Sequence, residues 1–357
     1  MNLRGSPYER GLLQAGLCPE MIGPVRENVH VQLGKYQQLL QSDKAKGYLG
    51  EQIRITGELF PDVFEEVKGI SKGFDLRMID LFRFYHLRIL LDMDGCTSWA
   101  VSLSSKQAVV GKNRDLADGN KVFQRVFVHH DPDWQGKKIL SLGSLGAPCA
   151  YSSGINSQGF CLADTNILTT DHGSGACRYF LMPFLLTTCD NVDQALEKIS
   201  DLPHAGGGSL ALADSHGKIA VVELGHHHLN TQKSIRWLVK TNHFTSAELG
   251  PRNLKAGRQS SIKNSEDRLS FTKRKISVIY RDFDLDKAIE MMKSHDQEGG
   301  ICRHHDEDTS TTISGAVYTC GNRKLYFSDG NPCDSLWYEF SLSKEKMGEK
   351  REGSHLK

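Results

Sequence analysis

The feature of this sequence that most limits its possible folds is a change of pattern at Gly95. Before Gly95, apolar side chains recur at helical spacing, as in the series Val25, Val29 and Leu33. After Gly95, short apolar runs alternate with turn signals, which is typical of strands. Residues 1–95 are therefore expected to form a helical leader, and residues 96–357 a portion rich in strands.

Strands are expected in eight segments after the leader: Cys96–Leu103, Ala108–Arg114, Arg125–His129, Lys138–Leu142, Leu210–Ala213, Ile219–Leu224, Gly315–Thr319 and Lys324–Phe327. Helical stretches are expected near 176–202 and 265–295, and a surface loop at 250–263. In the leader, Pro61 is typical of the first turn of a helix, and Asp75 is expected to cap the next one. Strands and helices do not alternate regularly, so the pattern favours an α+β fold over a doubly wound sheet.

Composition excludes several classes of function. The 357 residues carry a formal net charge of +1, so no broad attraction to nucleic acid or to an anionic membrane is expected. The start of the chain lacks the apolar region of a signal peptide, and no apolar run reaches the ~18 residues of a membrane span. Nine scattered cysteines do not suggest a disulfide framework, so a cytoplasmic protein is expected.

The junction Asp94-Gly95-Cys96 suggests a nucleophile that matures by self-cleavage. Glycine permits the strained backbone in which the Cys96 thiol can attack the Gly95 carbonyl. Hydrolysis of the resulting thioester would leave Cys96 with a free α-amine. An α-amine has a pKa of ~7.7–8.0 and a thiol ~8.5, so this amine can serve as the base for its own thiol.

Beyond this junction, a series of motifs in order along about residues 60–340 resembles the penicillin acyltransferase-like family (peptidase family C45) and, more distantly, the choloylglycine hydrolases. The motifs are Asp94-Gly95-Cys96-Thr97-Ser98, Gly111-Lys112-Asn113-Arg114-Asp115, Gly154-Ile155-Asn156-Ser157-Gln158-Gly159-Phe160, Ala163-Asp164-Thr165-Asn166, Thr241-Asn242-His243-Phe244, Ser265-Glu266-Asp267-Arg268, Ile301-Cys302-Arg303-His304 and Gly330-Asn331-Pro332-Cys333. Each motif alone is weak, whereas the ordered set is specific.

The resemblance implies an N-terminal-nucleophile (Ntn) hydrolase fold, a four-layer αββα sandwich. It also implies cleavage between Gly95 and Cys96, which leaves an α chain (1–95) bound to a catalytic β chain (96–357). Cys96 maps to the nucleophile and Asp115 to the carboxylate that orients its amine. Asn166 and Asn242 map to the groups around the oxyanion, and Arg268 to a supporting arginine.

One position departs from the pattern of the choloylglycine hydrolases. They carry arginine where this chain has Lys112, and lysine cannot reproduce a planar two-pronged donor. This difference argues against bile-salt hydrolysis. Without the resemblance, Asp115 would be a turn residue, Asn166 and Asn242 would be turn caps, and Arg268 would lie on a solvated helix face.

Two clusters raise the alternative of a metal-dependent hydrolase: His226-His227-His228 and Cys302–Asp308. Neither has the paired spacing of a zinc site, and adjacent histidines on a strand point to opposite faces. We interpret the first as an exposed strand end and the second as a loop, with Cys302 a core cysteine. No metal and no cofactor are therefore expected.

The sequence predicts an N-terminal-cysteine amide hydrolase or acyltransferase that acts on a small-molecule amide through a Cys96 thioester. Water as acceptor would make it an amidase, and an amine would make it an acyltransferase. Besides the metal-dependent hydrolase, an uncleaved binding protein on the same scaffold is an open alternative. A homo-oligomer is compatible with the sequence.

Overall fold

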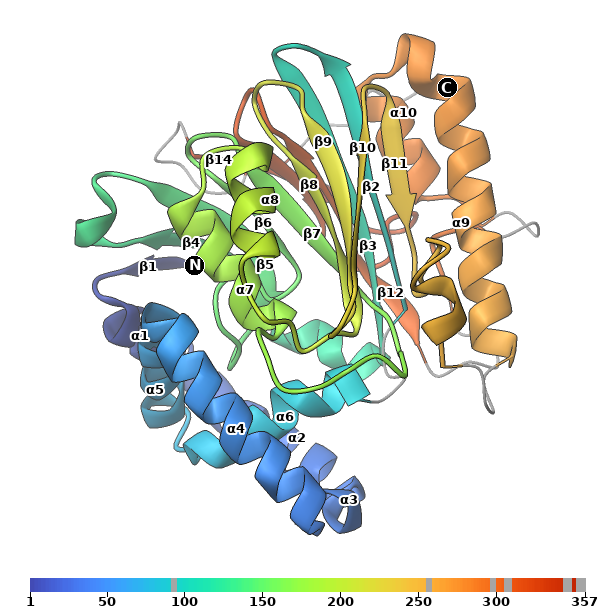
Figure 1. Ribbon diagram of the computed structural model, residues 1–357. Helices are drawn as coiled ribbons and strands as arrows, with labels where there is room; N and C mark the ends of the chain where they lie inside the picture. Colours follow the sequence, from blue (N-terminus) through green and yellow to red (C-terminus); the bar gives the residue numbers. More distant parts are fainter. Residues whose placement is uncertain (91–94, 255–258, 296–299, 305–309, 343–348, 351–357) are drawn as a thin grey trace.

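The computed structural model describes residues 1–90, 95–254, 259–295, 300–304, 310–342 and 349–350. Within these residues two β-sheets lie face to face, and helices cover both outer faces (Figure 1). The layers follow the order helix, sheet, sheet, helix. The predicted α+β class and the four-layer αββα sandwich are therefore confirmed.

The first sheet has eight strands, in the order β1-β4-β5-β6-β7-β8-β9-β10. Their bounds are β1 Asn2–Arg4, β4 Gln124–His130, β5 Lys138–Ser144, β6 Ser153–Asn156, β7 Cys161–Asn166, β8 Gly208–Ala213, β9 Ile219–Leu224 and β10 Leu229–Ser234. Neighbouring strands are antiparallel, except that β1 runs parallel to β4.

The second sheet has seven strands, in the order β11-β2-β3-β12-β13-β14-β15, and all its pairs are antiparallel. Their bounds are β2 Gly95–Ser104, β3 Gln107–Leu116, β11 Trp237–Lys240, β12 Thr311–Thr319, β13 Lys324–Ser328, β14 Trp337–Ser341 and β15 Glu349–Lys350. All eight predicted strands are present, because turn residues delimited each apolar run clearly.

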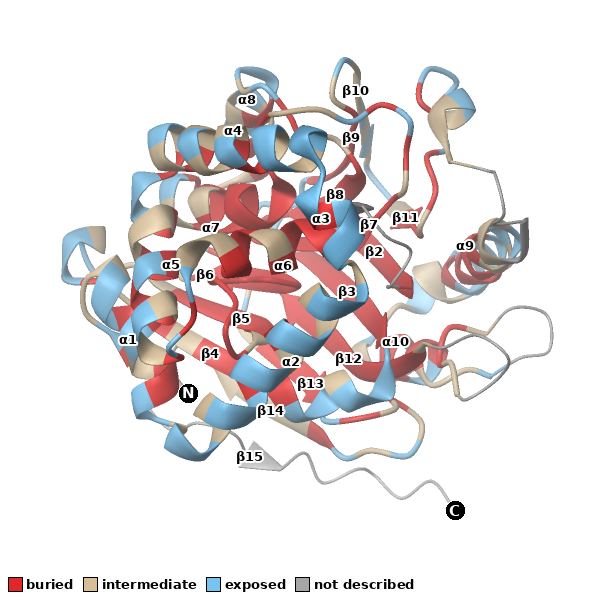
Figure 2. Ribbon diagram, turned by 90° about the horizontal axis from the view of Figure 1, so that it is seen from below, coloured by how far each residue is buried: buried red, intermediate tan, exposed pale blue. Residues whose placement is uncertain are grey.

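Apolar side chains from both sheets fill the space between them. Ala100 and Val110 of the second sheet belong to the same buried cluster as Leu140 and Ile155 of the first. Figure 2 shows this buried centre, with exposed residues concentrated on the outer helices. The centre of the sandwich is therefore a packed core, and chemistry must take place at the ends of strands.

On one outer face, helices α9 (Gln259–Ile279) and α10 (Leu285–Met292) pack on the second sheet, where Phe271 and Met292 contact a cluster with Trp99 and Val317. On the other, α7 (Arg178–Thr188) and α8 (Val192–Ser200) pack on the first sheet.

The surface loop predicted at 250–263 is wrong in its last part, because α9 already begins at Gln259. Residues 255–258 of that segment lie outside the described residues. Short 3-10 helices lie at Pro19–Met21, Asp118–Phe123, Pro132–Trp134, Gly250–Arg252 and Tyr280–Asp282.

Residues 1–90, the described part of the leader before β2, are mainly helical and also contain β1. The helices are α1 Pro7–Gly16, α2 Ile22–Lys35, α3 Gln37–Gln41, α4 Asp43–Leu59, α5 Pro61–Gly73 and α6 Met78–Leu90. Pro61 is the first residue of α5, as predicted. Asp75 does not cap α6: it has a φ of 52°, its carboxylate accepts from Arg26 at 2.9 Å, and the helix begins three residues later.

The leader packs directly on the first sheet. Strand β1 extends that sheet, and the side-chain amide of Gln14 exchanges two hydrogen bonds of 3.0 Å with the backbone of Gly146 and Ala147. The rings of Phe82 and Phe180 lie 5.4 Å apart, within a shared apolar cluster. No helix in the described part of the chain is both long and apolar enough to cross a bilayer.

Candidate active site

The topology of the second sheet explains why the predicted residues meet. Strand β2 begins at Gly95, and its two neighbours are antiparallel to it. The ends of β11 and β3 therefore lie beside the start of β2. Asn242 follows the last residue of β11 by two positions, and Asp115 pairs in register with Gly95. Asp94 of the predicted motif lies outside the described residues.

Asn242 contacts the backbone of the predicted nucleophile. Its side-chain oxygen accepts a hydrogen bond from the Cys96 nitrogen at 2.8 Å, and its amide nitrogen donates to the Asn166 carbonyl at 2.9 Å. The loop is held from behind, because the Asn242 backbone N–H donates to Ser265 Oγ at 2.8 Å. Asn242 thus joins the ends of both sheets around Cys96.

Arg268 lies on α9 and reaches under the same residues. One guanidinium nitrogen donates to the Cys96 carbonyl at 2.7 Å and to Thr97 Oγ1 at 3.0 Å, and the other donates to Asn242 Oδ1 at 2.8 Å. Its side chain is buried, and the alternative of a solvated helix face is therefore wrong. Arg268 fixes the carbonyl of Cys96 and the amide of Asn242 together.

Asp115 is fully buried at the end of β3. Thr312 Oγ1 donates to its Oδ1 at 2.7 Å, and an Arg303 guanidinium nitrogen lies 3.9 Å from its Oδ2. Gly95 leaves room for this carboxylate: a Cβ at position 95 would lie 2.9 Å from Asp115 Oδ2 and 2.7 Å from Arg303 Nη1. Asp115 is therefore a buried group beside the Gly95–Cys96 bond and does not form a turn.

Asn166 is the last residue of β7 in the opposite sheet. Its side-chain oxygen accepts from Arg178 at 2.9 Å, which fixes the orientation of the amide. Among the described residues, its side-chain nitrogen has no hydrogen-bond acceptor, although the residue is only 3% exposed. That nitrogen is thus available as a donor.

A sequence model of the family described as acyl-coenzyme A:6-aminopenicillanic acid acyl-transferase matches residues 102–334, which is more than half of the chain. The chain belongs to this acyltransferase family. The matched segment contains Asp115, Asn166, Asn242 and Arg268, whereas Cys96 and the leader precede it. The suspected resemblance is therefore confirmed at the level of an enzyme family.

Solved structures show a more distant likeness. Two variants of conjugated bile acid hydrolase from Clostridium perfringens are 13% and 15% identical to the chain, with TM-scores of 0.47 and 0.49; the alignments cover 72% and 73% of this chain and 97% and 100% of theirs. Penicillin V acylase from Agrobacterium tumefaciens is 12% identical, with a TM-score of 0.39 and coverage of 72% and 81%. No curated protein matches the chain in sequence.

A buried ion network lies beside the candidate site of this member of the family. The Asp164 carboxylate binds Lys112 on one oxygen and Arg178 Nε at 2.9 Å on the other. Burial by itself would raise the pKa of Asp164, but the two cations outweigh burial and hold that pKa below its usual value. Lys112 is thus a structural cation bound to Asp164. Neither Arg178 nor Asp164 was predicted as a site residue, because buried charges cannot be distinguished from surface charges by sequence pattern.

His243 is not a cation in this site. Its Nδ1 lies 2.7 Å from Ser265 Oγ, the hydroxyl that also receives the Asn242 N–H. Burial, reinforced by the charges of Lys240 and Arg268, lowers the pKa of His243 to about 4. The imidazole is therefore neutral near pH 7 and supports the Asn242 loop through Ser265.

The run His226-His227-His228 lies between β9 and β10. His227 Nδ1 is 2.7 Å from Asp171 Oδ1, His228 Nδ1 is 3.3 Å from Asp171 Oδ2, and His226 Nδ1 is 2.6 Å from the His204 carbonyl. His227 and His228 share the Asp171 carboxylate, whereas His226 binds a backbone carbonyl. Within the described residues, the three rings are not part of a group that could hold a metal. Cys302 and His304 of the second cluster lie close to two further potential ligands, His295 and Cys333. Asp306, Glu307 and Asp308 lie outside the described residues.

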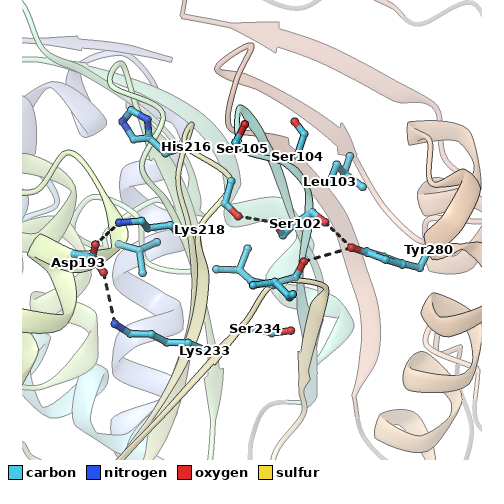
Figure 3. Close-up of a pocket in the computed structure, with 14 residues that line it drawn as sticks. Ser102, Leu103, Ser104, Ser105, Asp193, His216, Lys218, Lys233, Ser234 and Tyr280 are labelled. Carbon is cyan, nitrogen blue, oxygen red and sulfur yellow. Dashed lines mark hydrogen bonds and ion pairs between the residues drawn. The ribbon is translucent and has the colours of Figure 1, made fainter.

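A cavity of about 900 Å³ lies at the other end of β2 (Figure 3). It is lined by Ser102, Tyr280 and the ion-paired Asp193, Lys218 and Lys233. Tyr280 closes one side by donating to the Ser102 carbonyl at 3.2 Å. None of the predicted catalytic residues lines this cavity, so the candidate active site is separate from it.

Proposed function

We propose that this chain is an N-terminal-cysteine amide hydrolase or acyltransferase that matures by cutting the Gly95–Cys96 bond. The observation that carries the proposal is the hydrogen bond from the Cys96 nitrogen to Asn242, combined with Arg268 on the Cys96 carbonyl. Both contacts hold the backbone of one buried cysteine, which a core cysteine would not require. Family membership supplies the reaction class.

In the maturation step, the Cys96 thiol attacks the Gly95 carbonyl and loses its proton. The C–N bond breaks, the nitrogen takes up a proton, and the Gly95 acyl group is left on sulfur. Water then hydrolyses this thioester, which frees the Gly95 carboxylate and the Cys96 thiol. Asp115 and Arg303, which flank Gly95, are placed to orient this peptide.

In turnover, the new α-amine takes the thiol proton while sulfur attacks the substrate carbonyl. A hydrogen bond from the amine to Asn242 Oδ1 would hold the nitrogen so that its lone pair faces the thiol. The amine returns the proton to the leaving nitrogen, and a thioester remains on Cys96. Water or a second amine then takes the acyl group.

The tetrahedral oxyanion needs donors at the junction of the two sheets. Asn166 offers its side-chain nitrogen, because Arg178 already binds its oxygen. Asn242 has one N–H left after its bond to the Asn166 carbonyl. Two such donors in a buried site are worth several kcal/mol to a transition state, typically ~3–4 kcal/mol each.

For the substrate, we propose a small molecule with a linear amide or an activated acyl group. The family is described by acyl transfer from acyl-coenzyme A to 6-aminopenicillanic acid, and the similar structures include a penicillin V acylase. No step of this mechanism requires a cofactor. We further propose that residues 1–95 remain bound as the α chain.

The experiment is mass spectrometry of freshly purified wild-type protein and of Cys96→Ala. The wild type should give two chains, one that ends at Gly95 and one that begins at Cys96. Cys96→Ala should give a single uncleaved chain. Cys18→Ala, a leader cysteine outside the site, is the matched control and should cleave normally. Cleavage at another bond, or an intact wild-type chain after long incubation, would contradict the proposal. The matured enzyme would then be assayed with penicillin V and with an acyl-coenzyme A plus 6-aminopenicillanic acid.

A further inference from the structure

Four potential metal ligands from three segments converge beside the second sheet. Cys302 Sγ lies 3.6 Å from Cys333 Sγ and 3.8 Å from His304 Nε2, and His304 Nε2 lies 3.1 Å from Cys333 Sγ. With His295 included, one ligand atom of each residue lies within 4.8 Å of every other. A tetrahedral zinc ion, with bonds of ~2.3 Å to sulfur and ~2.0 Å to nitrogen, separates its ligands by roughly 3.3–3.8 Å.

The three segments are held together by one backbone hydrogen bond and one from a side-chain amide to a backbone carbonyl. His295 follows α10, Cys302 and His304 precede β12, and Cys333 follows β13. The Cys302 N–H donates to the Ser294 carbonyl at 3.0 Å, which joins the first segment to the second. Asn331 donates to the Arg303 carbonyl at 3.1 Å, which joins the second to the third. The ligands are thus brought together by the fold.

We propose that His295, Cys302, His304 and Cys333 bind one structural zinc ion. Two thiolates and two neutral imidazoles would balance the charge of Zn²⁺, and the two thiol protons would be released to solvent. Sulfur and nitrogen ligands in this number favour zinc. A disulfide between the two cysteines would not account for the two imidazoles at the same point.

With four protein ligands the site has no open position for a water molecule. Such closed sites stabilise folds and do not activate a nucleophile. The proposal therefore differs from a metal-dependent hydrolase, in which the metal would perform the chemistry. Here the ion would clamp three loops at one edge of the sandwich.

Zinc binding would also affect the candidate active site at the start of β2, and this part of the inference rests on the proposed function. Arg303 lies between two ligands in sequence, its N–H donates to Thr312 Oγ1 at 2.8 Å, and its guanidinium lies 3.9 Å from Asp115. Fixing Cys302 and His304 fixes the backbone of Arg303. The zinc would thereby position Arg303 beside Asp115 and Gly95, as a positioning element for cleavage.

The test measures metal content in the Cys96→Ala background, where self-cleavage plays no part. Protein expressed with added zinc and purified under reducing conditions should contain about one zinc ion per chain. Cys302→Ser and Cys333→Ser should each lose most of it, whereas Cys18→Ser and His227→Ala should keep it. Bound cobalt should give a thiolate charge-transfer band in the Cys96→Ala parent and in the two control variants. The band should be lost in Cys302→Ser and Cys333→Ser.

The proposal would be overturned if the reduced parent protein contained no more zinc than Cys302→Ser does. It would also be overturned if Cys302 and Cys333 formed a disulfide and the protein took up no metal after that disulfide was reduced. If both cysteine variants unfold by circular dichroism, the cobalt spectrum of the parent protein decides: absence of the thiolate band overturns the site. The link to Arg303 is tested separately, in protein with Cys96 intact. Zinc removal should slow self-cleavage at least tenfold, and an unchanged rate would overturn that step alone.

Discussion

The backbone nitrogen of Cys96 donates to the side-chain oxygen of Asn242, although 146 residues separate the two in sequence. The contact arises because β2 starts where its antiparallel neighbour β11 ends. Arg268 binds the same oxygen of Asn242 and also the Cys96 carbonyl. Cys96 is thus held at both ends of its own backbone, which fixes the position from which its thiol would react.

The first prediction concerns Arg268. Arg268 uses one nitrogen for the Cys96 carbonyl and another for the Asn242 oxygen, and lysine offers a single nitrogen in their place. Arg268→Lys should therefore lose at least one charge-assisted hydrogen bond. Self-cleavage should slow by roughly 10–100-fold, corresponding to ~1.5–3 kcal/mol. The rate is followed by denaturing electrophoresis of protein made in a cell-free reaction. Arg274→Lys, at an exposed position of the same helix, should cleave as the wild type does; equal rates for both variants would remove Arg268 from the site.

The second prediction concerns Gly95. A methyl group at this position would lie under 3.0 Å from the Asp115 carboxylate and the Arg303 guanidinium, so both side chains must move. Gly95→Ala should slow self-cleavage by at least about tenfold, because small misplacements of reacting groups are costly. The control is Gly119→Ala, where a Cβ has open space around it. Wild-type cleavage in Gly95→Ala would show that the close packing at position 95 is not needed.

The third prediction is that the leader stays bound after cleavage. It contributes β1 to the first sheet and a large part of one apolar core cluster, so separation would expose this cluster to water. The two chains should co-elute in native gel filtration and separate only in denaturant. Their separation in native buffer would contradict the shared fold.

The fourth prediction is a pH dependence at the contact between leader and first sheet. Glu66 on α5 is buried 3.9 Å from His129 and in the field of Arg10. Burial raises the pKa of Glu66 from 4.5 to about 7, against the opposing effect of Arg10. The folded-state pKa is raised, so the contribution of Glu66 to stability is fully present below pH 4.5 and is lost as the pH rises through 7.

Glu66→Gln should therefore gain stability relative to the parent protein as the pH rises from 4.5 to 8, by roughly 1–3 kcal/mol. Chemical denaturation in the uncleaved Cys96→Ala background measures this difference. His129, whose pKa burial lowers, changes stability in the opposite direction and is present in both proteins. Glu65→Gln, at the neighbouring half-exposed position, should show no such trend; an equal trend in both variants would rule out burial as the cause.

Much of the arrangement could be predicted from sequence because it follows from local signals. Turn residues delimited the strands, and the glycine–cysteine junction marked the start of β2. The order of motifs then indicated Asp115 and Asn242, which the antiparallel register brings to one end of the sheet, and Arg268, which reaches the same end from α9. Asp75 was misassigned as a helix cap because its backbone is left-handed and α6 begins three residues later, which the local sequence pattern does not reveal.

The partners of these residues could not be predicted, since they come from distant positions and carry no local signal. Thr312 and Arg303 reach Asp115 from nearly 200 residues away, and Arg178 is a buried cation within an apolar helix. The same reason explains the metal ligands. Cys302 and His304 are neighbours in sequence, but His295 and Cys333 complete the set only in three dimensions.

The last prediction separates the roles of the two asparagines. Asn242 uses its oxygen for the Cys96 nitrogen and one N–H for Asn166, so it has one N–H for an oxyanion. Asn166 has its whole side-chain nitrogen available, because Arg178 holds only the oxygen. Both variants must be supplied in cleaved form, by expressing the two chains separately and refolding them together, so that maturation does not limit the assay.

Asn166→Ala should then lose about 10²–10³-fold in kcat with little change in KM, because a donor to the oxyanion acts mainly in the transition state. Asn242→Ala should lose at least as much, and its pH–rate profile should also shift, because the amine that serves as base has lost its acceptor. Asn253→Ala is the control: among the residues that the structure describes, its side-chain amide bonds only to the backbone of Phe244 and Gly250 in the adjoining loop. If both active-site variants keep near wild-type kcat, backbone groups alone hold the oxyanion. If Asn242→Ala loses kcat but keeps the wild-type pH–rate profile, the side-chain oxygen of Asn242 does not position the base.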